Sequence, residues 1–196
     1  MSAKHTIDQV QQVQGKGKGM IRQIYWHMKG EQQRPAWNCL MFNNAARPKA
    51  YFTMWIILNQ KLVTVDRLVQ WGVAVDKNSV LCMNTEESIE HLFLQCQYAR
   101  KLWERLLGWI DQQSAFPMTW GQFLQWSTQH GKEKSTTTQI FTIVLAEGVY
   151  GVWIERNNKI IEHKSKMEEN TAKEIAYVTI ARASPSIKNV VRQWKF

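Results

Sequence analysis

The sequence has 196 residues, of which 44% are hydrophobic, and this is enough to bury one sizeable core. Ten tryptophans and eight methionines exclude a chain that is disordered throughout. Three cysteines form no disulfide framework and the first residues lack the apolar run of a secretory leader, so we expect the reducing interior of a cell.

The positive charge of the chain lies towards its two ends. The formal net charge is +9 and the pI is about 9.6. Residues 1–50 carry eight basic and two acidic side chains, residues 151–196 carry nine and five, and the hundred residues between them sum to minus one. This distribution favours a polyanionic partner such as nucleic acid, although a solvated basic surface would show the same pattern.

The N-terminal third begins with a polar segment and continues into helices. Residues 1–19 are Gln-rich, end in a Gly-Lys repeat and lack apolar periodicity, so we predict a flexible basic arm. Apolar residues at helical spacing predict a short amphipathic helix over residues 20–30. Pro48 suits the first turn of a helix, and the apolar residues that follow it as far as Leu58 predict a central helix.

Two further helices are predicted in the middle of the chain. Thr64 is an N-cap candidate for a helix over residues 65–71, on whose apolar side we expect Trp71. An acidic first turn opens a helical pattern that extends over residues 85–107. Signals for β structure are weak, apart from a short pairing expected within residues 73–80.

A long apolar helix is predicted in the C-terminal third, over residues 138–163. Its apolar run, residues 140–154, is shorter than a bilayer span and contains Glu147, so we predict a buried helix and no membrane span. Shorter helices are predicted at residues 120–126, 171–182 and 187–194. The chain is therefore predicted to be mainly α.

Cys82, His91 and Cys96 have the residue types and the close spacing of zinc ligands. A four-ligand knuckle of the Cys-x2-Cys kind would place another thiolate at position 79, which is Ser79. Three of four ligands are thus recognisable, and the fourth could be water or Cys39. The alternative is a site that has lost its metal and is held by the surrounding aromatic residues.

A zinc site with one open position could also be catalytic, with Glu90 beside His91 as a general base. In the alternative interpretation Glu86, Glu87 and Glu90 are acidic residues of a first helical turn that complement the helix dipole. We favour the second interpretation and predict no catalytic residue.

The order of motifs around these cysteines resembles the zinc-binding domain at the C-terminal end of plant non-LTR (LINE-type) retrotransposon reverse transcriptases. Matching residues occur at Pro48, Lys49, Phe52, Trp55, Leu62, Thr64, Asp66, Arg67, Leu68, Trp71, Gly72, Cys82, Glu87, Ser88, His91, Leu92, Phe93, Cys96 and Trp103. A Trp-x-Glu-Arg-Asn segment that follows the domain in those elements is matched by Trp153, Glu155, Arg156 and Asn157. Ser79 departs from the pattern, because the family has its first cysteine there.

The resemblance implies an irregular helical bundle around a small zinc knuckle, intact or degenerate, in a plant protein of the nucleus or cytoplasm. It divides the chain into a flexible basic arm (1–19), the zinc-binding-like domain (20–112) and a C-terminal helical extension packed on it (113–196). The paired aspartates and the palm of a polymerase are absent from the sequence, so this polypeptide is not itself a reverse transcriptase.

The first functional hypothesis is a non-catalytic module that binds RNA or single-stranded nucleic acid. Its phosphate contacts would come from Lys16, Lys18, Arg22, Arg47, Lys49, Arg156 and Lys159. Exposed aromatic rings would add base stacking, and the candidates for exposure are Trp26, Trp126 and Trp194. The alternative is a protein-interaction or small-ligand-binding protein that has abandoned the zinc site, and less favoured still is an enzyme with new chemistry.

Overall fold

The computed structural model describes residues 34–112, 114–183 and 185. The elements below all lie in the unit Ala36–Phe196. The predicted arm (1–19) and the predicted helices at residues 20–30 and 187–194 lie outside the described residues.

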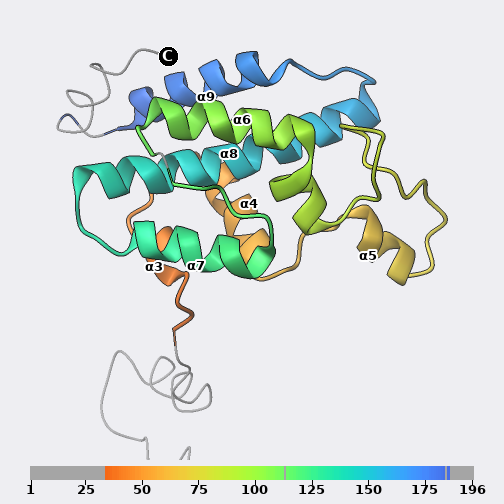
Figure 1. The fold of residues 1–196 in the computed structure, drawn as a ribbon, viewed down its shortest axis with the longest axis horizontal. Helices are drawn as coiled ribbons and strands as arrows, with labels where there is room; N and C mark the ends of the chain where they lie inside the picture. Colours follow the sequence, from red (N-terminus) through yellow and green to blue (C-terminus); the bar gives the residue numbers. More distant parts are fainter. Residues whose placement is uncertain (1–33, 113, 184, 186–196) are drawn as a thin grey trace, which may run out of the picture. The chain divides into compact units, whose positions relative to one another are not determined.

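Helices make up the regular structure of the described residues, which confirms the predicted mainly α class (Figure 1). Within the described ranges, β structure is limited to one antiparallel bridge between Asn78 and Glu86. The elements are α3 (Asn38–Met41), α4 (Pro48–Leu58), α5 (Val65–Gln70), the π-turn η1 (His91–Gln95), α6 (Gln97–Trp109), α7 (Trp120–Gly131), α8 (Thr136–Ile161) and α9 (Glu168–Arg182).

Helix α8 is the centre of the fold, because α4, α6, α7, α9 and η1 all pack against it (Figure 1). Within the described residues it is the one helix long and apolar enough to cross a membrane, but 72% of that apolar window is buried inside the protein. The buried stretch also includes Glu147, Glu155 and Arg156. We therefore interpret α8 as the core helix that the sequence predicts.

The helix starts follow local capping rules where the sequence offers a cap. Pro48 occupies the first turn of α4, as predicted. Thr119 accepts a hydrogen bond from the backbone N of Gln122 and forms a capping box with it, so α7 begins at Trp120 and continues five residues beyond the prediction to Gly131. Ser135 caps α8 in the same way, through the backbone N of Thr138.

Helix α5 follows the predicted bounds but not the predicted burial. Among its residues only Val65 is buried, and Trp71 at its C-cap is 60% exposed. The expected apolar side is wrong because none of the described helices packs closely along α5, which lies apart from the central helices at the right of Figure 1. Gly72 follows with φ of 79°, a conformation that suits glycine at a helix end.

The continuous helix predicted over residues 85–107 is wrong. A π-turn, marked by the 2.6 Å hydrogen bond from Cys96 N to His91 O, interrupts the pattern at His91–Gln95. The backbone is then extended at Cys96, with φ of −55° and ψ of 132°, before α6 begins. The apolar periodicity continues on both sides of this break, which is why the sequence alone does not reveal it.

Replacing Gly148 by alanine is expected to lower the free energy of unfolding by about 1–3 kcal/mol through overpacking. A Cβ at this position in α8 would lie 2.5 Å from two ring carbons of Trp103. That indole is held in place, because its Nε1 donates to Phe93 O at 2.9 Å and its ring stacks on Phe116. Urea denaturation measures the change.

Gly108 provides the matched control, because a Cβ there would meet nothing within 4 Å. Gly108→Ala in α6 is expected to be neutral or to stabilise the protein by about 0.5–1 kcal/mol, since alanine is the better helix former. Equal effects of the two substitutions would contradict the proposed contact between α8 and Trp103.

Candidate metal centre

Three of the predicted metal ligands meet at the start of α6. The thiols of Cys82 and Cys96 and a ring nitrogen of His91 all lie within 4.8 Å of one another, and Cys82 Sγ is 3.1 Å from His91 Nε2. Ligand atoms around a tetrahedral zinc lie roughly 3.5–3.8 Å apart, as follows from zinc–ligand distances of about 2.0–2.3 Å. The three donors therefore fit zinc with only small movements.

Two local features of the backbone bring these donors together. Met83 N donates to Ser79 O at 2.8 Å, and Met83 has φ of 59°, so the chain reverses tightly just after Cys82. The π-turn His91–Gln95 and the extended backbone at Cys96 place both ligands before the first turn of α6. A continuous α-helix would have no such break between these two ligands.

Burial sets the protonation states of the donors. It lowers the pKa of His91 below its usual value, with a partial opposing effect from Glu87, so the imidazole is neutral and can donate a lone pair at neutral pH. Burial, with a further contribution from nearby Cys82, raises the pKa of Cys96 to about 11. Zinc must displace the Cys96 proton when it binds, so its affinity should increase with pH.

Ser79 stands at the sequence position where the resemblance implies a fourth ligand. It is fully buried, and its Oγ has no hydrogen-bond partner within the described structure. Ser79 N donates to Thr85 O at 2.8 Å, which holds the residue in the same turn as Cys82. A buried hydroxyl without a partner is costly in an apolar core, and a metal-bound water or a metal ion would satisfy it.

Cys39 does not belong to this cluster. Its thiol lies against α7, where it contacts Thr128 O at 3.9 Å, and it is absent from the group of mutually close donors. Burial raises its pKa as well. Of the two fourth ligands considered from the sequence, Cys39 is therefore excluded and water is retained.

An ion pair links the loop that carries Cys82 (residues 71–90, the metal-binding loop) to the central helix α8. Glu87 is 1% exposed, and its carboxylate accepts hydrogen bonds from Arg156 Nη2 at 2.8 Å and Nε at 3.2 Å. The same carboxylate accepts from Val65 N at 3.1 Å, so it also caps α5 in place of the predicted Thr64 side chain. Glu87 thus joins α5, the loop and α8.

The ion pair corrects two predictions. Arg156 is 7% exposed and bonded to Glu87, so it has no surface to offer a phosphate. Glu87 is likewise not a first-turn acid of its own helix. Glu90, considered as a general base, accepts a hydrogen bond from Trp120 N at 2.8 Å and so caps α7.

Arg47 is also a structural residue rather than a phosphate contact. Its backbone N and its guanidinium donate to the buried carboxylate of Glu147 at 2.7 and 2.8 Å, and its guanidinium lies 5.2 Å from the centre of the Tyr150 ring. The side chain is 30% exposed, and Glu147 is fully buried. The interaction joins the start of α4 to α8, and the two residues are 100 positions apart in the sequence.

The remaining predicted nucleic-acid contacts lie at the surface or outside the described residues. Lys49 is exposed and Lys159 is half-buried, and neither forms an ion pair with any part of the chain that the structure describes. Trp126, predicted to be exposed, is 8% exposed and packs between Phe116 and Phe141. Lys16, Lys18, Arg22, Trp26 and Trp194 lie outside the described residues.

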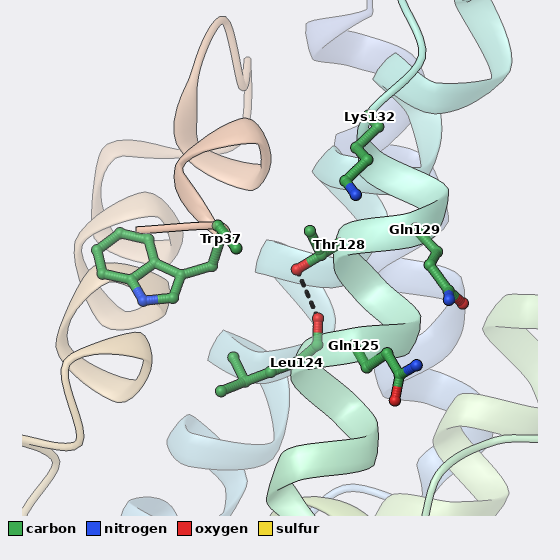
Figure 2. A pocket seen from close by; sticks show the side chains of 7 residues that line it. Trp37, Leu124, Gln125, Thr128, Gln129 and Lys132 are labelled. Carbon is green, nitrogen blue, oxygen red and sulfur yellow. Dashed lines mark hydrogen bonds between the residues drawn. The ribbon is translucent and has the colours of Figure 1, made fainter. Parts of the chain in front are cut away.

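A cleft of about 380 Å³ lies between the turn before α3 and helix α7 (Figure 2). Figure 2 shows Trp37 on one side of the cleft and Leu124 and Thr128 of α7 on the other. Its lining residues are Ala36, Trp37, Leu124, Gln125, Thr128, Gln129 and Lys132. Lys132 is the one ionisable side chain among these described lining residues, so they offer no acid–base pair for catalysis.

The comparisons with known proteins identify the segment that carries the cluster. Residues 20–103 match the family model described as zinc-binding in reverse transcriptase. No curated protein and no solved structure matches the chain. The matched segment includes all three clustered donors together with Ser79. Residues 20–103 are therefore similar to the zinc-binding domain of reverse transcriptases, the family that the sequence motifs resemble.

Proposed function

We propose that this chain is a non-catalytic nucleic-acid-binding module, derived from a retrotransposon, whose metal-binding loop is stabilised by zinc. The carrying observation is the three-donor cluster within the segment that matches the reverse-transcriptase domain. The net charge of +9 supports a polyanionic partner. RNA or single-stranded nucleic acid is the ligand that we propose.

The partners of the buried acids support a non-catalytic role. Glu87 is bonded to Arg156, Glu147 to Arg47, and Glu155 to Lys166 N at 2.7 Å. Each carboxylate thus has a structural function that a proton-transfer role would disrupt. Zinc in this setting would cross-link the Ser79–Met83 turn to the start of α6.

Of the predicted phosphate contacts we retain Lys49 and Lys159, which have no ion pair within the described residues. We also retain Lys16, Lys18 and Arg22, which lie outside the described residues. Arg47 and Arg156 are withdrawn from this set, because both are bonded to buried glutamates.

Neutralising Lys16, Lys18 and Arg22 as glutamines is expected to flatten the salt dependence of binding. For single strands, log Kobs falls with log salt by about 0.7 per neutralised phosphate, so losing three contacts should reduce the slope by roughly 2. Fluorescence anisotropy with a labelled single-stranded oligonucleotide between 50 and about 200 mM salt measures it. Lys134→Gln, at an exposed residue outside the proposed set, is the control and should leave the slope unchanged. Absence of binding at all salt concentrations would refute the proposed function.

A further inference from the structure

Helix α4 exposes aromatic rings on the face that points away from the core. Its inward face is fully packed, with Ala50, Met54 and Ile57 at most 1% exposed. On the opposite face, Phe52 is 59% and Trp55 is 40% exposed. We call Phe52 and Trp55 the α4 ridge. A helix that only filled the core would carry polar residues at these positions.

The two rings of the α4 ridge form one stack. Their centroids are 6.2 Å apart, and their planes differ by 13°. They are three residues apart on the helix, which is the spacing that places side chains side by side. Two nearly parallel, exposed aromatic faces are suited to planar ligands that stack, such as nucleobases.

The charge around the α4 ridge is uniformly positive in sequence. Residues 34–65 contain four basic side chains and no acidic one. Lys49, in the first turn of α4, and Lys61, just after its end, are both exposed and have no ion pair with any described residue. Arg47 is also close in sequence, although Glu147 neutralises it.

A second aromatic and cationic pair lies where the chain leaves α4. Arg67 donates to the carbonyl oxygen of Gln60, which follows the helix, and its guanidinium lies 5.8 Å from the centre of the Trp71 ring. Trp71 is 60% exposed. A further exposed ring with a basic side chain beside it therefore lies in the segment that follows α4.

We propose that the α4 ridge is a stacking platform for the bases of single-stranded nucleic acid, with Lys49 and Lys61 as phosphate contacts. The inference rests on the proposed function and adds the site at which bases are bound. Basic residues without acidic neighbours in the sequence favour a polyanionic ligand over an average protein surface. Parallel exposed rings favour unpaired bases over a duplex, whose base faces are already stacked on one another.

The test compares a 12-nucleotide oligo(dT) with an abasic oligomer of the same length and charge, by anisotropy at fixed salt. Phe52→Leu/Trp55→Leu is expected to weaken oligo(dT) binding roughly 5- to 150-fold per stacked base. Binding of the abasic oligomer and the salt slope should stay unchanged, because the lysines remain. Tyr177→Leu removes a similarly exposed ring (74%) from α9 and is the control, expected to bind as the wild type does.

The outcomes separate the platform from the wider function. If the ridge variant binds oligo(dT) as tightly as the wild type, or if the wild type binds both oligomers equally, the platform is refuted while nucleic-acid binding stands. If no oligomer binds the wild type, both proposals fail. If light scattering shows a wild-type dimer that the ridge variant dissociates, the α4 ridge is an interface between two copies, and the platform is again refuted.

Discussion

Replacing Ser79 by cysteine is expected to raise the affinity for zinc roughly 100-fold. Structural sites with four ligands bind zinc with apparent free energies of about 10–16 kcal/mol, so one thiolate of four contributes roughly 3 kcal/mol. Ser79 is fully buried in the turn that carries Cys82, and its Oγ has no partner to lose. Competition with a chromophoric chelator measures the affinity. The midpoint of thermal unfolding at saturating zinc should rise by about 6–12 °C.

Two variants bracket the Ser79→Cys result. Ser79→Ala removes only the unpartnered hydroxyl, so it should keep the wild-type stability in the absence of zinc or improve it slightly. Cys96→Ser removes one of the three donors and should abolish stoichiometric zinc. Equal zinc affinities for wild type and Ser79→Cys would show that position 79 lies outside the coordination sphere.

Arg156→Leu is expected to lower the free energy of unfolding by about 3–5 kcal/mol. The substitution leaves the Glu87 carboxylate buried without its counter-charge, and this is the costly way to break a buried ion pair. For a chain of this size the midpoint of thermal unfolding should fall by about 6–20 °C. Differential scanning fluorimetry and urea denaturation both measure the effect.

The controls for Arg156→Leu distinguish lost charge from lost packing. Lys159→Leu changes a half-buried base of the same helix that has no ion pair in the described residues, and should alter stability by no more than about 0.5 kcal/mol. The double variant Glu87→Gln/Arg156→Leu should recover part of the loss, because glutamine can still accept from Val65 N without a charge. A double variant no more stable than Arg156→Leu would contradict the argument from uncompensated charge.

Local signals in the sequence predicted the helices well where one residue fixes a boundary. Pro48 and the apolar run after it gave α4 its observed limits, and Gly72 ended α5. The same kind of reasoning missed the π-turn at His91–Gln95, because apolar spacing continues through it. Hydrophobic periodicity indicates which face of a segment is buried. It does not indicate whether a π-turn interrupts the α-helix.

The ligand cluster was predictable from residue types, whereas the roles of the arginines were not. Cys82, His91 and Cys96 lie within fifteen positions, so short loops can bring them together. Arg47 is paired with Glu147, 100 residues away in the sequence, and Arg156 is paired with Glu87, 69 residues away. No local sequence pattern specifies such a pair.

Exposure of the aromatic residues was the weakest part of the prediction. Polar neighbours in sequence suggested that Trp126 is exposed, but α7 turns it towards Phe141 of α8. Trp55 and Phe52 stand in an apolar helix that the sequence would place wholly inside, and they are exposed because α8 covers only one side of α4. Which side of an apolar helix is covered depends on its neighbours, and these are set by the tertiary fold.

The bond between Glu87 and Arg156 has a practical consequence for anyone who wishes to excise the reverse-transcriptase segment. A fragment ending at residue 103 would retain all three sulfur and nitrogen donors, yet it would lose the arginine that neutralises its buried acid and the helix on which α4 rests. Boundaries for expression should therefore include α8, because the unit that folds is longer than the unit that sequence families delimit.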